Sequence, residues 1–157
     1  MPTVSPEQAK ADAAIMNSLL DLERTAILAY TSGQSRLSGA PLRMMQTLLA
    51  HERAHAQVIE RVVIRLGAHP IRQRPASQYR AGFPPLVTAD EVLRFALDLE
   101  NTQVSAYNDS LGTIVTPELR ATVASILATE AEHMSAVLGA LHLPQAPQAL
   151  VTGNAPA

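Results

Sequence analysis

Cysteine and tryptophan are absent from this chain, and aromatic residues make up only 3% of it. The absence of cysteine excludes thiolate metal sites, a rubredoxin-type electron-transfer centre among them, and leaves the redox compartment open. With so few aromatic rings, the core must be built from aliphatic side chains and methionine, which suits helices. The formal net charge of −2 gives no electrostatic basis for binding nucleic acid.

Long apolar runs are also absent. No segment approaches the roughly 20 apolar residues that span a bilayer, so no membrane partner is expected. The first ten residues lack the basic and apolar regions of a secretory leader. A cytoplasmic location is therefore expected, unless a leader has been removed and the protein is exported. The 157 residues, 47% of them hydrophobic, predict one domain over 1–157. A homodimer is compatible with this sequence, which does not fix the oligomeric state.

Helical periodicity predicts an all-α fold of four long helices. Ser5-Pro6 is a typical N-terminal pair for the first helix, and Thr88 with Glu91 predicts a capping box for the third. The segment 67–87 contains four prolines and is predicted to be a long crossover without an element of its own. The tail 144–157 contains three prolines and is predicted to wrap irregularly or fray. The expected helices span about 5–32, 41–66, 88–111 and 117–141.

The sequence also repeats itself. The segment L-D-L-E-R-T-A-I-L-A-Y at 20–30 matches L-D-L-E-N-T-Q-V-S-A-Y at 97–107, which lies 77 positions later. Each copy lies in the first helix of one predicted helical hairpin. Two related hairpins joined by one long crossover predict a four-helix bundle with approximate two-fold symmetry, bounded at about 5–143.

Two copies of Glu-x-x-His, each preceded by a lone glutamate, are the most informative pattern in the chain. On a helix this spacing places both side chains on one face, one turn apart. All four glutamates fall within apolar stripes, and a buried ionised carboxylate costs several kcal/mol unless it is compensated. No lysine or arginine occupies these stripes, so a pair of metal ions is the predicted compensation. The predicted ligands are Glu23, Glu52, His55, Glu100, Glu130 and His133.

Other interpretations of these residues stay open at this point. The bundle could be a remnant that holds no metal, with its carboxylates protonated or hydrated. Tyr30 and Tyr107 each follow a lone glutamate by two turns, and they either hydrogen-bond carboxylates of the site or are core aromatics. His51 and Glu132 flank the motifs. They are predicted to point away from the site and to be solvated or to support it indirectly.

One competing motif is present. His51 to His55 spells H-E-x-x-H, the helix signature of zinc metalloproteases, in which two histidines bind zinc and the glutamate is the general base. That chemistry needs a third ligand and usually a strand edge that holds the substrate. The sequence predicts no strand, and the motif leaves the lone glutamates and the second Glu-x-x-His unexplained. We therefore disfavour a zinc protease.

With these residues in view, the chain resembles the ferritin-like superfamily over about 5–143. More narrowly, it is similar to bacterial ferritin-like domain proteins allied to the desiccation-related group. Arg53 stands where bacterioferritins have a haem-ligating methionine, so no haem is expected. The missing fifth helix argues against a storage cage. The roles that this resemblance implies are bridging for Glu52 and Glu130, terminal for Glu23 and Glu100, and binding of one metal each for His55 and His133.

The resemblance and the predicted ligand set together lead to a hypothesis for function. Carboxylates with imidazoles suit iron and manganese. The leading expectation is a non-haem di-iron oxidoreductase with Fe(II), O2 or peroxide as substrates, linked to oxidative stress. The expected cofactor is two iron ions, with manganese or a mixed pair as alternatives. The competing hypotheses are a di-manganese, catalase-like enzyme and a non-enzymatic, stress-related metal-binding or structural protein.

Overall fold

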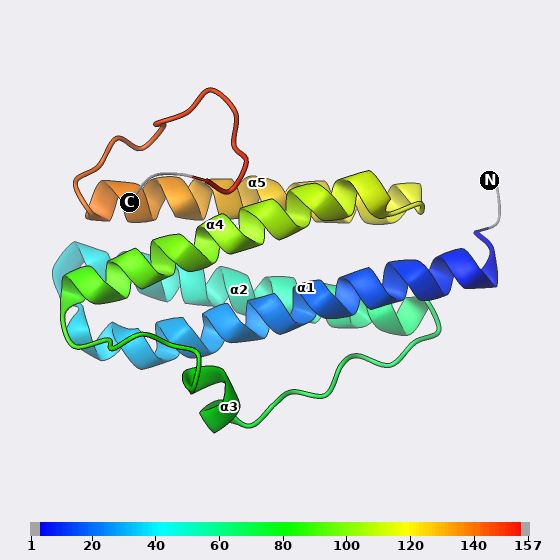
Figure 1. Cartoon of the computed structure of the whole chain (residues 1–157), viewed down its shortest axis with the longest axis horizontal. Coiled ribbons are helices and arrows are strands. Elements are labelled where there is room, and N and C mark those ends of the chain that lie inside the picture. The colour runs from blue at the N-terminus through cyan, green and yellow to red at the C-terminus, as the bar shows by residue number, and fades with distance from the viewer. Residues whose placement is uncertain (1–3, 155–157) are drawn as a thin grey trace.

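The computed structural model describes residues 4–154, and four long helices form its body (Figure 1). No strand is present within that range. The predicted all-helical bundle of two hairpins is therefore confirmed. The first hairpin consists of α1 (Pro6–Gly33), the short 3-10 helix η1 (Gln34–Arg36) and α2 (Gly39–Arg65), and the second of α4 (Ala89–Thr113) and α5 (Pro117–Ala140).

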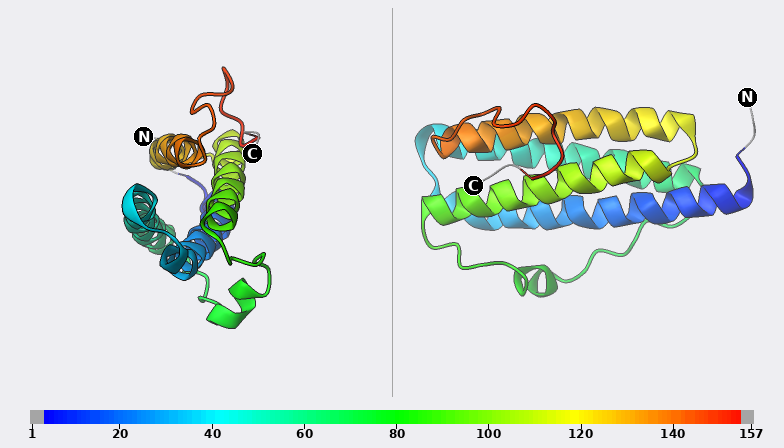
Figure 2. Two further views of the ribbon diagram at one scale, coloured as in Figure 1. Left: turned by 90° about the vertical axis from the view of Figure 1, so that its left-hand side faces the viewer. Right: turned by 45° about the horizontal axis from the view of Figure 1, so that its top comes forward.

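The helices pack as two hairpins laid side by side. Within each hairpin the two helices pack along their length, and the hairpins meet mainly through α1 and α4. A smaller contact joins α2 and α5. Viewed along the bundle, the four helices surround a common interior (Figure 2). Within residues 4–154 no helix has the length and apolarity needed to cross a membrane.

Local sequence explains where the helices begin and end. Ser5 caps α1 in a capping box with Gln8, and Thr88 caps α4 in the same way with Glu91. The chain leaves α2 through Gly67, whose φ of 77° lies in the left-handed region that glycine adopts without steric cost. The predicted helix ends agree with these bounds to within about two residues at most positions.

The crossover between the hairpins differs from the prediction. The segment 67–87 contains a short helix, α3 (Ala76–Arg80), where no element was expected. Five residues are too few to display a helical period. Tyr79 is buried there, and its hydroxyl donates to Asp21 of α1 at 3.0 Å. Arg74 pairs with the same carboxylate at 2.7 Å, so tertiary contacts with α1 hold this turn in place.

The start of α5 is fastened to α1 by a buried carboxylate. Asp12 is 1% exposed and accepts hydrogen bonds from the backbone amides of Val115 and Thr116 at 3.2 and 3.1 Å. The Thr116 hydroxyl donates to it at 2.6 Å. Amides at a helix start lack partners within the helix, so Asp12 satisfies them and fixes α5 relative to α1.

Two apolar clusters fill the interior of the bundle at its two ends. One is built around Tyr30, Met45 and Leu97, and the other around Met16, Ile59 and Tyr107. The four glutamates of the predicted site are buried on the same helices. The polar residues of the site are thus enclosed by apolar packing on both sides, which keeps bulk water away from them.

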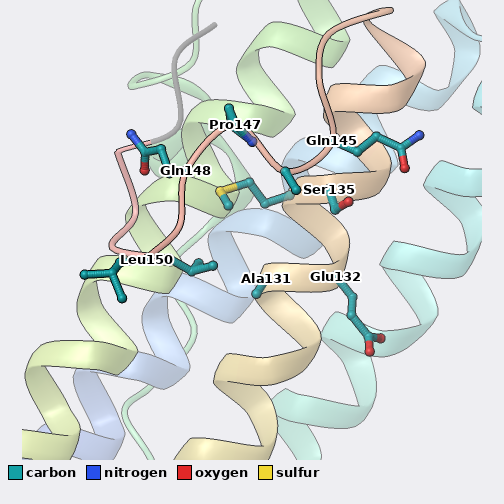
Figure 3. A pocket seen from close by; sticks show the side chains of 10 residues that line it. Ala131, Glu132, Ser135, Gln145, Pro147, Gln148 and Leu150 are labelled. Carbon is teal, nitrogen blue, oxygen red and sulfur yellow. The ribbon is translucent and has the colours of Figure 1, made fainter.

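The tail after α5 wraps over the bundle as irregular structure. Asn108 of α4 donates from its side-chain nitrogen to the Val151 carbonyl at 3.1 Å. Gly153 lies so close to α4 that a Cβ there would approach the Asn101 carbonyl oxygen to 2.3 Å. A pocket of about 270 Å³ lies between the tail and α5, and its lining includes none of the predicted ligands (Figure 3).

Candidate metal centre

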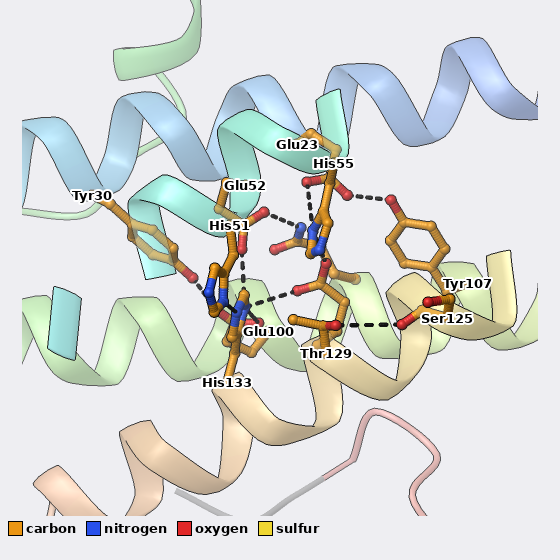
Figure 4. Close-up of polar contacts among 12 residues, drawn as sticks. Glu23, Tyr30, His51, Glu52, His55, Glu100, Tyr107, Ser125, Thr129 and His133 are labelled. Atoms are coloured by element: carbon orange, nitrogen blue, oxygen red, sulfur yellow. Dashed lines mark hydrogen bonds and ion pairs between the residues drawn. The ribbon is translucent and has the colours of Figure 1, made fainter. Parts of the chain in front are cut away.

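All six predicted ligands converge in the middle of the bundle, where the four long helices meet (Figure 4). The lone glutamates come from α1 and α4, and the two Glu-x-x-His motifs come from α2 and α5. Each glutamate is 0% exposed. We call this group the Glu/His cluster; its members are Glu23, Glu52, His55, Glu100, Glu130 and His133.

The cluster divides into two overlapping sets of potential ligands. Within each set, one ligand atom from every residue lies within 4.8 Å of the others. Glu52 and Glu130 belong to both sets, as two bridging carboxylates would. The first set adds Glu23 and His55 to this pair, and the second adds Glu100 and His133. We name these the Glu23/His55 position and the Glu100/His133 position. That the six residues bind metal stays a prediction.

The polar atoms inside the cluster approach one another without forming hydrogen bonds. His55 Nδ1 lies 2.9 Å from a Glu130 oxygen, and His133 Nδ1 lies 3.1 Å from a Glu52 oxygen. Within residues 4–154, neither nitrogen has a hydrogen-bond partner of acceptable geometry, nor does any cluster glutamate satisfy all of its buried oxygens. Buried polar atoms are almost always satisfied. Lone pairs aimed at a shared centre are the arrangement that a cation requires.

Burial makes the cluster electrostatically costly without a cation. Desolvation raises the pKa of Glu23 and of Glu100 well above the ordinary value of 4.5. Neighbouring carboxylates raise both pKa values further, although His133 opposes the rise at Glu100. Against the same desolvation, the two histidines lower the pKa of Glu130 to about 2. Burial lowers the pKa of His133, but the carboxylates around this histidine outweigh burial and raise the pKa to about 12. Without metal, the cluster must therefore hold protons.

Each hairpin contributes one tyrosine, whose hydroxyl donates a hydrogen bond to the lone glutamate of the other hairpin. The Tyr30 hydroxyl of α1 donates to Glu100, and the Tyr107 hydroxyl of α4 donates to Glu23. Of the two interpretations left open by the sequence, the hydrogen-bonded one is observed. Desolvation raises the pKa of both tyrosines well above 10, and the nearby carboxylates raise it further, so both hydroxyls keep their protons at neutral pH.

His51 is exposed, but its ring faces His133, so the predicted direction of this side chain was wrong while its indirect support of the site is observed. Its Nδ1 lies 2.9 Å from Nε2 of His133, and the two rings stack with centroids 5.2 Å apart. If His133 binds metal through Nδ1, its Nε2 carries the proton and donates to His51. Such outer contacts fix the tautomer and orientation of a metal-binding imidazole. The contact depends on how α2 and α5 pack, which the sequence of α2 alone does not reveal.

Gln103 is a buried polar residue that the sequence analysis did not single out. It is 1% exposed, and its side-chain nitrogen donates to Glu52 at 2.9 Å. It lies one turn after Glu100 on the same helix face. Its repeat equivalent in the first hairpin is Ala26. The sequence could have indicated this residue, because a glutamine in an apolar stripe stands where the other repeat has alanine.

The zinc-protease alternative does not fit this arrangement. Neither potential ligand set includes His51, which contacts His133 across the bundle. The described residues also contain no strand that could hold an extended substrate. The donor set of carboxylate oxygens and imidazole nitrogens instead fits two iron or manganese ions.

A known protein family resembles this chain in sequence, and a solved structure resembles it in fold. A family model described as the ferritin-like domain matches residues 11–143. A solved ferritin-like, diiron-carboxylate protein from Bacillus anthracis str. Ames superposes with a TM-score of 0.72. The two chains are 19% identical, and the match covers 85% of this chain and 97% of the other. At this identity the match shows the fold alone. No curated protein matches the chain in sequence.

Proposed function

The chain belongs to the ferritin-like domain family, and from this premise we propose that it is a non-haem di-iron oxidoreductase that oxidises Fe(II) with O2 or peroxide. The observation that supports this most directly is the set of buried carboxylate and imidazole atoms that approach within 2.9–3.6 Å without hydrogen bonds. The similar protein from Bacillus anthracis is described as a diiron-carboxylate protein, which favours iron over manganese here.

Each residue of the cluster has a distinct task in this proposal. Glu52 and Glu130 would bridge the two ions, because both belong to both ligand sets. Glu23 and Glu100 would complete one position each. The four carboxylates would balance the charge of two divalent ions, and because histidine ligands are neutral the loaded site would have no net charge.

The proposed chemistry is a two-electron reduction of the oxidant. Two Fe(II) held by the Glu/His cluster would each give up one electron and become Fe(III). Hydrogen peroxide would take up these two electrons and two protons from solvent to yield two waters, and O2 would take up the same to yield hydrogen peroxide. The tyrosines hold their protons at the hydroxyl oxygen and orient Glu23 and Glu100 through hydrogen bonds. The apolar clusters at both ends of the bundle exclude bulk water, which strengthens every charge interaction at the site.

The test begins with metal-free protein under anaerobic conditions. Two Fe(II) ions per chain are added, followed by O2 or hydrogen peroxide, and Fe(III) formation and oxidant consumption are recorded together. We expect rapid oxidation of two Fe(II) per peroxide, and oxidation at the rate of free Fe(II) for Glu52→Ala. Equal rates for both proteins would contradict the proposal. Fast O2 release from peroxide by the Mn(II)-loaded protein alone would favour the di-manganese alternative.

A further inference from the structure

The two halves of the cluster meet the molecular surface differently. His133 is 3% exposed, and the ring of His51 stacks over it at an interplanar angle of 16°. His55 is 9% exposed. The residue that matches His51 in the second hairpin is Thr129, since each directly precedes the glutamate of its motif. A threonine cannot cover its neighbouring histidine as an imidazole ring does.

A groove of about 430 Å³ reaches the cluster where the smaller residue lies. It runs between α2 and α5 with His55 and Thr129 in its lining, and Thr129 and Ser125 are seen on α5 beside His55 in Figure 4. A second groove of about 570 Å³ lies on the same seam, but its lining contains no residue of the cluster. The first groove is lined by His55, Val58, Ala121, Thr122, Ser125, Ile126 and Thr129.

The two threonine hydroxyls of this groove are arranged as acceptors. Thr122 donates its hydroxyl proton to the Glu118 carbonyl at 3.2 Å, and Thr129 donates to the Ser125 carbonyl at 3.3 Å. Their oxygen lone pairs are then available to other partners. Water molecules around a cation donate hydrogen bonds outward. Neutral oxygen acceptors therefore favour a hydrated cation without trapping it as a carboxylate would.

We propose that this groove is the route by which divalent cations reach and leave the cluster, so that the Glu23/His55 position exchanges its ion faster than the Glu100/His133 position. The inference rests on the proposed di-metal function. His51 closes the direct path over His133, and an ion held there must leave past the first position. The two ions of a symmetric ligand set thus become kinetically distinct through one difference between the repeats.

The experiment follows the removal of Co(II), which reports its own coordination through its visible absorption. Protein loaded with Co(II) is mixed with excess EDTA, and loss of absorption is recorded with time. We expect two phases of one ion per chain each, with rates that differ by about tenfold or more. Binding of fewer than two ions would overturn the di-metal function and this inference with it. Two ions that leave at one rate would overturn the inference alone.

The repeat itself supplies the matched variants. Thr129→His should slow the fast phase by about tenfold, and His51→Thr should accelerate the slow phase towards the fast one. Thr129→Leu should also slow the fast phase, and it contains no imidazole that could bind cobalt. Thr113→His, at an exposed position outside the groove, should change neither rate. Unchanged fast phases in both Thr129 variants, or an equal effect of Thr113→His, would overturn the proposal.

Discussion

The two hairpins contribute the same ligands but differ in the residues beside them. Each provides one lone glutamate and one Glu-x-x-His, and each sends a tyrosine hydroxyl to the glutamate of the other. Around this shared frame, His51 of α2 corresponds to Thr129 of α5, and Gln103 of α4 corresponds to Ala26 of α1. In the proposed function, the shared residues would hold two ions. The differing residues would give each ion different surroundings.

The largest effect on metal content is expected from substituting a glutamate shared by both positions. Glu52→Ala should abolish binding of both ions, because a bridging carboxylate completes both coordination shells and screens both charges. Glu23→Ala should weaken mainly one. Elemental analysis of protein loaded with Fe(II) or Mn(II) measures this directly. Glu130→Ala and Glu100→Ala are the matched variants in the other hairpin. Retention of two ions by Glu52→Ala would show that the bridging assignment is wrong.

The second prediction concerns the pH dependence of the metal-free protein. The pKa values of Glu23 and Glu100 are raised in the folded state, so their contribution to stability is complete below 4.5 and is lost as pH rises through the folded values. The pKa of Glu130 is lowered to about 2, so its contribution is lost as pH falls below 4.5. The pKa of His133 is raised from 6.5 to about 12, so its contribution is also lost as pH rises above 6.5. The metal-free melting temperature should therefore decline as pH rises above about 5.

Two further measurements sharpen this pH prediction. The metal-loaded protein should gain stability over the same pH range, since metal ions replace protons at the carboxylates and bind only the folded state. Glu23→Gln and Glu100→Gln should each flatten the metal-free profile, because glutamine does not titrate. A metal-free melting temperature that rises steadily from pH 5 to pH 8 would contradict the burial argument.

A smaller effect is expected at the crossed tyrosines. Tyr30→Phe should weaken the Glu100/His133 position and Tyr107→Phe the Glu23/His55 position, each by about tenfold, which is the lower range for residues that support metal ligands. Titration with Co(II), read by absorption, resolves the weakened site. The two variants serve as controls for each other, because each should leave one of the two ions nearly unaffected. Equal weakening of both ions in either variant would mean that the tyrosines act on the cluster as a whole.

The smallest effect is expected at Gln103. Gln103→Ala makes the second hairpin resemble the first, and it removes the amide hydrogen bond to Glu52. Two iron ions should then have more similar electronic environments, while metal content stays at two per chain. Mössbauer spectra of iron-loaded protein provide the readout, as a reduced separation between two quadrupole doublets. An unchanged separation would mean that Gln103 does not contribute to the difference between the two positions.

The features that could be predicted from the sequence are those that repeat and those that place ionisable residues among apolar ones. Helical periodicity predicted the four long helices, and the duplicated motif with its glutamates inside apolar stripes predicted the convergence of six residues. The helix α3 escaped prediction because five residues show no period. The His51–His133 contact escaped because it depends on the packing of α2 against α5. Gln103 was overlooked although its departure from Ala26 in the repeat was visible in the sequence.

In the proposed function, the Glu/His cluster holds two ions through the shared carboxylates of Glu52 and Glu130. Anomalous scattering from crystals soaked in Fe(II) or Mn(II), collected at the absorption edge of each metal, tests this most directly. We expect two peaks roughly 3.5–4 Å apart, the typical separation in two-metal sites. Glu52 and Glu130 should lie between the peaks, with Glu23 and Glu100 at opposite ends. A single peak, or two peaks too far apart for one carboxylate to bridge, would contradict it.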